Sequence, residues 1–257
     1  MGKILVGEIC GVEFVMASQI QDAFAESLAK LAVPIDGKAA RRLAQYHVLL
    51  CVWNTRMNLT GDTALTTALS RLYMDSLAPL ALEGLFPDNA DVIDVGSGAG
   101  FPGLPLAIAR PDLSFVLLDS LNKRVRFLQE VVDTLGLTNV SCMHARAEDA
   151  AHQPALRERF LVAVARAVAP APVLMELLLP FVRVGGHALC YKGPLAEEET
   201  ASGIRAAAML GGGTLVVKPV TVPDEPDWRH CVMYCPKEKP TQADYPRKAG
   251  LPAKAPL

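Results

Sequence analysis

The segment Asp94-Val-Gly-Ser-Gly-Ala-Gly-Phe-Pro-Gly103 decides the fold of this chain, and it directly follows the apolar pair Val92-Ile93. Glycine allows a backbone to turn sharply and to approach a ligand more closely than a Cβ atom would permit. A second apolar run ends in an acid, Asp119, 23 residues after Gly96. A glycine turn followed by an acid about 20 residues later is the arrangement that holds the ribose of a nucleoside cofactor in a βαβ unit. The sequence therefore predicts a nucleoside-cofactor site at this turn.

From residue 91 onward, short apolar strands alternate with helices, which predicts an α/β fold with a mostly parallel sheet. The expected strands cover residues 92–95, 114–119, 140–144, 160–165, 187–191, 215–222 and 230–235, and the expected helices cover 104–110, 123–135, 172–180 and 196–210. The last two strands follow each other without a helix, so they should form an antiparallel hairpin. We therefore predict a Rossmann-like sheet of seven strands whose last strand is antiparallel.

The antiparallel strand at the end of the predicted sheet distinguishes two classes of nucleoside-binding fold. Class I S-adenosylmethionine-dependent methyltransferases add an antiparallel final strand, whereas nicotinamide-binding Rossmann domains usually end in parallel strands. The glycine spacing is Gly-x-Gly-x-Gly rather than Gly-x-Gly-x-x-Gly, although Gly103 weakens the distinction. The class I methyltransferase is the favoured fold, and a nicotinamide-dependent oxidoreductase is the alternative.

Before the sheet, apolar residues at three- and four-residue spacing predict helices over 19–31, 38–53 and 66–77, with Asp36 as the N-cap of the second helix. The predicted organisation has four parts. They are a leader of unclear role (residues 1–17), an N-terminal helical cap (18–85), a cofactor-binding domain (86–236) and a basic C-terminal tail (237–257).

Composition excludes several classes of protein. The most apolar region, residues 160–186, is interrupted by Arg166, Glu176 and Arg183, so no span of about 20 apolar residues remains for a membrane helix. Six scattered cysteines fit reduced thiols in the cytosol, and core packing explains them better than a metal site. The net charge of −2 gives no sign of nucleic-acid binding. We expect a cytoplasmic protein without a metal site.

Further motifs extend the pattern over residues 18–257. They are Trp53-Asn54, Met57-Asn-Leu-Thr60, Asp75-Ser-Leu77, Leu118–Leu128, Ala165-Arg166-Ala167, Tyr191-Lys192-Gly193 and Tyr245–Leu257. In this order they resemble the RsmG (GidB) family. The resemblance implies a bacterial methyltransferase that uses S-adenosyl-L-methionine to modify N7 of a guanine in the 530 loop of 16S ribosomal RNA. The implied partner is 16S rRNA or the small ribosomal subunit, and we expect a monomer.

Two features depart from the family pattern. Family members usually carry a histidine where this chain has Leu72, so any RNA or loop contact of that histidine is absent or replaced here. The first 15 residues have no counterpart in the family, and our hypothesis is that Met16 rather than Met1 is the biological start.

The expected cofactor site joins the glycine turn to the ends of the following strands. A carboxylate at the end of a strand, such as Asp119, can accept hydrogen bonds from both ribose hydroxyls, although it can also cap the next helix. Arg166 ends an apolar strand and needs a partner, which can be the cofactor, a protein carboxylate or an RNA phosphate. Together with the positions that the resemblance implies, the predicted cofactor residues are Gly96, Gly98, Gly100, Phe101, Asp119, Ser120, Leu121, Ala147, Glu148 and Arg166.

The methylation of guanine N7 that the resemblance implies requires few chemical groups from the protein. Guanine N7 carries an in-plane lone pair and is unprotonated near neutrality, so no general base is needed and we assign no catalytic residue. In an A-form duplex the N7 edge faces a deep, narrow groove, so the target base must lie in a loop or be extruded. The predicted RNA contacts are Arg124, Lys192, Arg247, Lys248 and Lys254, each of which can also be an ordinary surface charge. An RNA-bound scaffold with a degenerate cofactor pocket is a further alternative.

Overall fold

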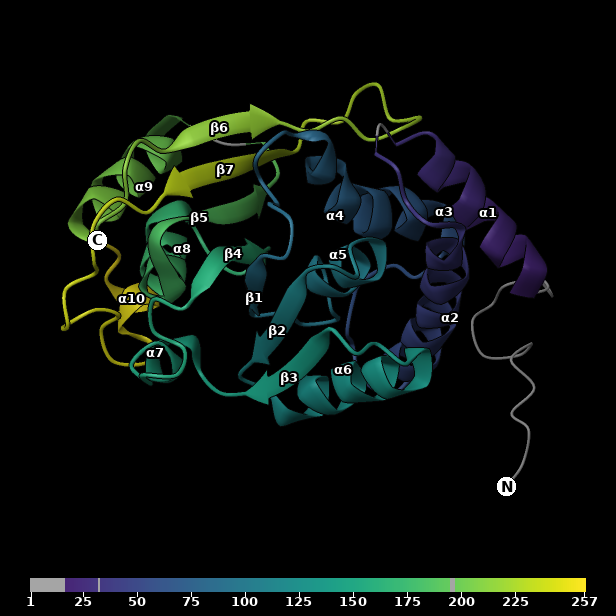
Figure 1. Cartoon of the computed structure of the whole chain (residues 1–257), viewed down its shortest axis with the longest axis horizontal. Helices are drawn as coiled ribbons and strands as arrows, with labels where there is room; N and C mark the ends of the chain where they lie inside the picture. Colours follow the sequence, from purple (N-terminus) through teal and green to yellow (C-terminus); the bar gives the residue numbers. More distant parts are fainter. Residues whose placement is uncertain (1–16, 32, 195–196) are drawn as a thin grey trace.

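The computed structural model describes residues 17–31, 33–194 and 197–257, so the predicted leader lies outside the described residues apart from Ala17. In the described part of the chain, a seven-stranded sheet runs through the molecule in the order β3-β2-β1-β4-β5-β7-β6 (Figure 1). The strands are β1 (Asp91–Val95), β2 (Ser114–Asp119), β3 (Val140–His144), β4 (Phe160–Arg166), β5 (Val182–Lys192), β6 (Val216–Pro219) and β7 (Cys231–Pro236).

Strands β1 to β5 are parallel to one another, and β7 is antiparallel to both β5 and β6. The predicted seven-stranded sheet with an antiparallel last strand is confirmed, and β7 lies between β5 and β6. Strand β5 begins five residues earlier than the alternation predicts. Its first half contains Gly185, whose φ is +87°, and Gly186, where a Cβ would overlap the carbonyl oxygen of Leu161 in β4. These glycines interrupt the apolar alternation, so the sequence pattern does not reveal the start of the strand.

Within residues 17–31 and 33–90, six helical segments precede the sheet. They are α1 (Ala17–Ala29), α2 (Gly37–Asn54), α3 (Leu65–Ala68), the π-helix η2 (Leu69–Met74), α4 (Asp75–Leu77) and the 3₁₀ turn η3 (Ala78–Ala81). The predicted N-cap is confirmed, because the Asp36 carboxylate accepts a hydrogen bond from the Lys38 N–H at 3.1 Å. The helix expected over residues 66–77 is not uniform, since its middle widens into the π-helix.

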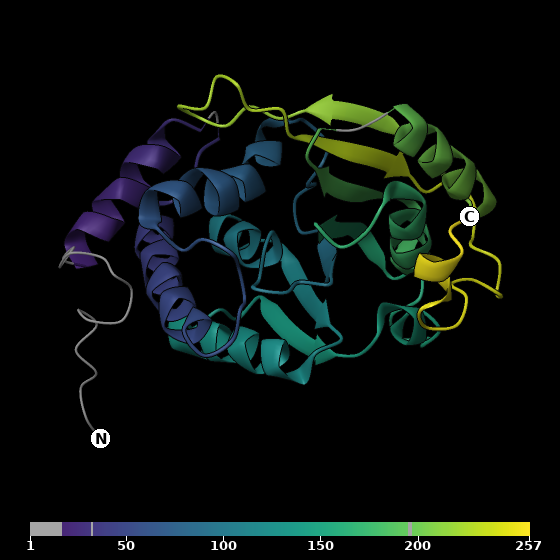
Figure 2. The ribbon, with the colours of Figure 1, turned by 180° about the vertical axis from the view of Figure 1, so that it is seen from behind.

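The remaining helices cover the two faces of the sheet. They are α5 (Gly103–Ala109), α6 (Asn122–Leu135), α7 (Ala147–Ala150), α8 (Ala171–Leu178), η4 (Leu179–Phe181), α9 (Glu197–Met209) and α10 (Leu251–Lys254). Helices α5 and α6 lie on one face with α2 packed outside them, and α8 and α9 lie on the other (Figures 1 and 2). A separate buried apolar cluster fills each face. No helix in the described ranges is both long and apolar enough to cross a bilayer.

Candidate cofactor cleft

The glycine turn after β1 leaves its backbone open at one position. Gly96 and Gly98 both have positive φ angles, +76° and +58°, which side chains of L-residues rarely adopt. A Cβ at Gly96 would lie 2.9 Å from Val168 Cγ2, so the protein itself requires glycine there. A Cβ at Gly98 would have only the Gly96 carbonyl oxygen within 4 Å, at 3.8 Å. The backbone at Gly98 is therefore accessible to a ligand.

Asp119 fixes this turn from the end of the neighbouring strand. Its side chain is buried, and Oδ2 accepts a hydrogen bond from the Gly98 N–H at 2.9 Å while Oδ1 accepts one from the Leu121 N–H at 2.8 Å. The Arg124 guanidinium lies 3.5 Å from Oδ2. A carboxylate has about four acceptor sites, so Asp119 retains capacity for ligand hydroxyls.

The ends of β1, β2 and β4 meet at a cleft of about 380 Å³. Seven of the predicted cofactor or RNA residues line it, namely Gly96, Gly98, Phe101, Asp119, Ser120, Arg124 and Arg166. The other lining residues, which the sequence analysis did not assign, are Leu59, Thr60, Leu72, Ser97, Ala99, Ala167 and Val168. Because Leu59, Thr60 and Leu72 precede the sheet, the N-terminal segment closes one side of the cleft.

Four predicted cofactor residues lie outside this lining in the part of the chain that the structure describes. Gly100 is buried beside Tyr46, and Leu121 is 52% exposed at the start of α6. Ala147 and Glu148 begin α7 after β3. The Glu148 carboxylate accepts a hydrogen bond from the Gly250 N–H at 2.8 Å, which connects α7 to the C-terminal tail.

A second buried carboxylate lies beneath the turn. Asp94 Oδ2 accepts a hydrogen bond from the Gly103 N–H at 3.0 Å, whereas Oδ1 is the one buried side-chain polar atom of the described residues without a hydrogen-bond partner. Burial raises the pKa of Asp94 to about 7. Asp94 is the first residue of the glycine motif, which is the one feature of the sequence that marks it as part of the site.

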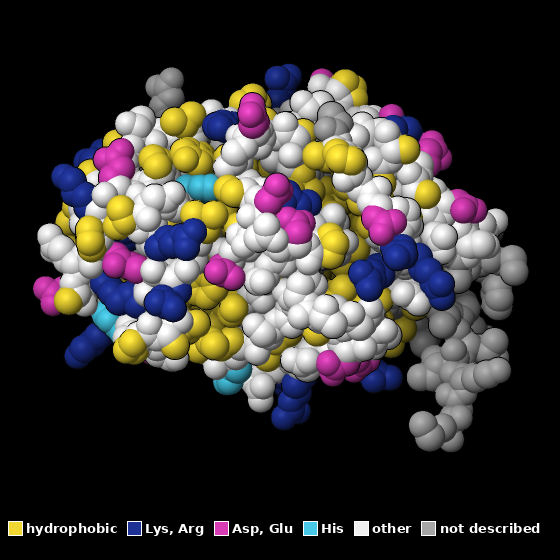
Figure 3. Space-filling model, viewed as in Figure 1, with side chains coloured by type: hydrophobic (Ala, Val, Ile, Leu, Met, Phe, Trp, Pro, Cys, Tyr) yellow, Lys and Arg dark blue, Asp and Glu magenta, His cyan; other side chains and the backbone are white. Residues whose placement is uncertain are grey.

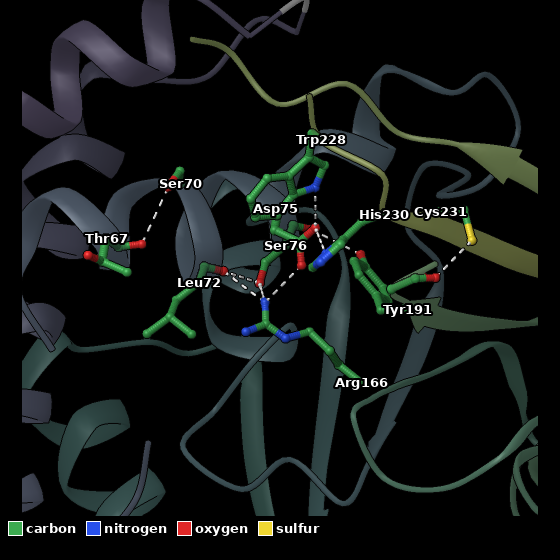
Figure 4. A network of polar contacts seen from close by, with 11 residues as sticks. Thr67, Ser70, Leu72, Asp75, Ser76, Arg166, Tyr191, Trp228, His230 and Cys231 are labelled. Carbon is green, nitrogen blue, oxygen red and sulfur yellow. Dashed lines mark hydrogen bonds and ion pairs between the residues drawn. The ribbon is translucent and has the colours of Figure 1, made fainter. Parts of the chain in front are cut away.

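Arg166 is paired within the protein. Its Nη1 donates to the Leu72 carbonyl oxygen and to Ser76 Oγ, both at 3.1 Å, and lies 3.3 Å from Asp75 Oδ2 (Figure 4). Its guanidinium carbon lies 5.3 Å from the centroid of the Phe101 ring, which is within the range of a cation–π contact. The sequence left three kinds of partner open for Arg166, namely the cofactor, a protein carboxylate or an RNA phosphate. The structure shows a protein carboxylate in this role.

The partner carboxylate, Asp75, collects two further donors from the opposite end of the chain. Trp228 Nε1 donates to Asp75 Oδ1 at 3.1 Å, and His230 Nδ1 lies 3.0 Å from the same oxygen (Figure 4). The Tyr191 hydroxyl donates to the Ser76 carbonyl oxygen at 3.0 Å. Helix α4, the end of β4 and the β6–β7 loop are thus joined at one buried acid. The motif Asp75-Ser-Leu77 includes this acid, but the sequence gave no sign of its contacts with Arg166, Trp228 and His230.

Three of the five predicted RNA contacts lie beside acids of the protein, and one of these is Arg124, which lies 3.5 Å from Asp119. Arg247 donates to the fully buried carboxylate of Glu176, with Nη2–Oε2 at 2.6 Å, and Lys192 Nζ lies 2.5 Å from Glu199 Oε1. Lys248 and Lys254 are exposed on the tail. On the face seen in Figure 3, Lys and Arg side chains form separate groups interspersed with acids.

The sheet order and a cleft at the carboxyl ends of its parallel strands define a class I methyltransferase fold. A mutant of MtNAS has a solved structure with a TM-score of 0.50 to this chain, at 12% identity over 87% of this chain and 76% of that one. This likeness concerns the fold alone.

The chain belongs to the GidB family. Residues 39–226 match the family model described as rRNA small subunit methyltransferase G. Ribosomal RNA small subunit methyltransferase G of Alkaliphilus metalliredigens is 42% identical over 228 residues, which cover 89% of this chain and 95% of the relative. The protein of the same name from Leuconostoc mesenteroides subsp. mesenteroides is 43% identical over 235 residues, covering 91% and 98%. The resemblance found from the motifs is confirmed.

Proposed function

We propose that this protein binds S-adenosyl-L-methionine in the cleft and methylates N7 of a guanine in the 530 loop of 16S ribosomal RNA. Membership of the family supports the reaction, since the relatives carry the name of small-subunit rRNA methyltransferases. The observation that carries the proposal is the pairing of Asp119 with the Gly98 N–H at the bottom of the cleft. It places a buried carboxylate beside an accessible backbone, which suits a ribose.

The residues of the cleft fit the parts of such a cofactor. Asp119 has acceptor capacity for the ribose hydroxyls, and the open backbone at Gly98 accommodates close approach. Asp94 lies beneath the turn rather than in the lining of the cleft, and its hydrogen bond from the Gly103 N–H supports the turn from below. Arg166 provides a cation for the methionine carboxylate. For Ala147 and Glu148, the family resemblance supports a position beside the adenine ring.

The cofactor, when bound, supplies a methyl group activated by the positive sulfur. Guanine N7 supplies its lone pair, so the protein needs no general base. The contribution of this chain is to hold both partners in line and to exclude water, an effect that can reach about 7–11 kcal/mol. Arg166 is suited to this task because its contacts with Asp75, Ser76 and Leu72 fix it in place.

Exposed cations of the tail and the cleft rim supply the expected RNA contacts. Lys248 and Lys254 support this role because their side chains are exposed, and half-buried Arg124 lies at the cleft, where it also pairs with Asp119. The substrate implied is 16S rRNA or the small subunit, bound by a monomer in the cytoplasm. Affinity for RNA should fall as salt rises, in proportion to the number of phosphates contacted.

Calorimetry with S-adenosylmethionine, S-adenosylhomocysteine and NAD tests the cofactor. We expect the first two to bind and NAD not to bind, whereas NAD binding alone would support the oxidoreductase alternative. Transfer of a tritiated methyl group to unmethylated small subunits, 16S RNA and partly assembled particles tests the reaction. Cofactor binding without transfer to any of these would support the scaffold alternative.

A further inference from the structure

A second hollow of about 680 Å³ adjoins the cofactor cleft. The two share Thr60 and Leu72 in their linings, so they meet at these residues. The six remaining lining residues are all polar, and they are Asp62, Thr66, Thr67, Ser70, Arg71 and Glu225. Figure 4 shows Thr67, Ser70 and Leu72 on the segment that leads to Asp75.

We propose that this hollow is the target-base subsite, in which an extruded guanine lies with its Watson–Crick edge on the carboxylate of Glu225. This inference rests on the proposed methylation of guanine N7. It adds the residue that selects guanine among the bases.

The shape of the purine requires such a neighbouring space. Guanine carries N7 on one edge and the N2 amino group on the opposite edge. When N7 faces the methyl donor in the cofactor cleft, the N1–H and N2–H groups therefore point away from that cleft. Enzymes read an extruded base by hydrogen bonds to its Watson–Crick edge. The reading group must lie in a hollow that is joined to the cofactor cleft and extends beyond it, as this one does.

A carboxylate is the matching group for guanine. The N1–H and N2–H groups are two adjacent donors, and an ionised carboxylate offers two acceptor oxygens and no donor. Adenine and cytosine present a ring nitrogen acceptor beside their amino group, which a carboxylate repels. Two acids line the hollow, Asp62 and Glu225, and their contacts decide between them.

Asp62 is already engaged in the protein. Its Oδ1 accepts a hydrogen bond from the Ala64 N–H at 2.8 Å, and its hydrogen bonds with that N–H and with Thr67 lower its pKa. Within the described residues, the half-buried Glu225 side chain makes no hydrogen bond or ion pair. A carboxylate that lines a hollow without a partner is available for a ligand.

The loop that carries Glu225 is anchored on both sides of this residue. Trp228 and His230 bind Asp75, and Asp224 pairs at 2.7 Å with Lys30, which directly follows α1. Figures 1 and 2 both show this β6–β7 loop passing over α4 toward α1. Glu225 therefore lies between two anchored positions of the loop, and one of these anchors binds the same Asp75 that pairs with Arg166. Exposed Arg71, on the same wall, is placed for a phosphate of the RNA.

The test compares Glu225→Gln with the wild-type protein on RNA that carries guanosine or inosine at the methylated position. Inosine keeps N7 and N1–H but lacks the N2 amino group. We expect wild-type protein to methylate guanosine RNA about tenfold faster than inosine RNA under single-turnover conditions, because one hydrogen bond to a charged group is lost. The variant should methylate guanosine RNA about tenfold more slowly and should not distinguish the two RNAs.

Affinity for S-adenosylhomocysteine should be unchanged in Glu225→Gln, which shows that the fold and the cofactor cleft remain intact. Asp227→Asn, an exposed acid of the same loop, is the matched control and should behave as wild type. An unchanged ratio of guanosine to inosine rates in Glu225→Gln overturns the subsite assignment while the proposed function stands. Absence of methyl transfer to guanosine RNA by the wild-type protein overturns both.

Discussion

The carboxylate of Asp75 holds the guanidinium of Arg166 with Oδ2 and Nη1 3.3 Å apart, although 91 residues separate them in the chain. Both side chains are largely shielded from solvent, at 5% and 14% exposed. The contact joins the N-terminal segment to the end of β4 at the cofactor cleft. Arg166 is consequently oriented by the protein before any ligand arrives, which reduces the cost of ordering it on binding.

Replacing Asp75 tests this relationship. Asp75→Ala leaves Arg166 without its buried partner and removes the acceptor for Trp228 and His230. We expect the free energy of unfolding to fall by about 3–5 kcal/mol, measured by urea denaturation. The conservative Asp75→Asn should lose less because it retains an acceptor oxygen. A loss below about 1 kcal/mol in Asp75→Ala would show that the network contributes little.

The two neighbouring cations Arg247 and Lys248 should differ in role. Arg247→Ala leaves the buried Glu176 carboxylate unpaired, so we expect about 3–5 kcal/mol lower stability. Lys248→Ala removes an exposed charge, so stability should stay within about 0.5 kcal/mol while RNA affinity falls and its salt dependence weakens. Urea denaturation and RNA titration at several salt concentrations measure the two effects. Equal stability of the two variants would contradict the structural role of Arg247.

Asp94 should make stability depend on pH in a defined direction. Burial raises its pKa from 3.8 to about 7, so between these values the folded protein binds more protons than the unfolded chain. The stability that this group contributes is complete below pH 4 and is lost as the pH rises through about 7. Relative to the uncharged Asp94→Asn, the wild type should therefore lose about 2 kcal/mol between pH 5 and 7. Parallel stability curves for the two proteins over this range would refute the prediction.

Asp119 should contribute directly to cofactor affinity. Asp119→Ala removes the acceptor proposed for the ribose and also frees the Gly98 and Leu121 N–H groups. We expect S-adenosylmethionine binding to weaken by about 1.5–3 kcal/mol, which corresponds to roughly ten- to hundredfold in the dissociation constant. Calorimetry measures it, with the exposed acid Asp133, changed to Ala, as the control. Unaltered affinity would remove Asp119 from the site.

Local sequence predicted the parts of the site that lie within one βαβ unit. One helix and one strand separate the turn at Gly96 to Gly100 from Asp119. The periodicity of apolar residues along the sequence reveals both of these elements. The wall formed by Thr60 and Leu72 was not predicted, because it reaches the cleft through tertiary packing that leaves no periodic signal. The π-helix, which widens the predicted helix just before Asp75, also had no local signature.

The basic tail shows why charge alone assigns function poorly. Arg247 and Lys248 are indistinguishable as sequence cations, but only Arg247 lies beside a buried acid, 71 residues earlier in the chain. Glu148 likewise contacts Gly250 across 102 residues. Pairings at such separations depend on the folded arrangement, so the sequence could propose all five RNA contacts but could not tell which cations the fold uses.

Identification of the modified nucleotide tests the central claim most directly. Unmethylated 16S rRNA in small subunits is incubated with the protein and labelled S-adenosylmethionine, then digested and mapped by mass spectrometry. The account predicts a single 7-methylguanosine, located in the 530 loop, and its loss with Asp119→Ala. Label in another base, at another atom of guanine, or in no RNA at all would contradict it.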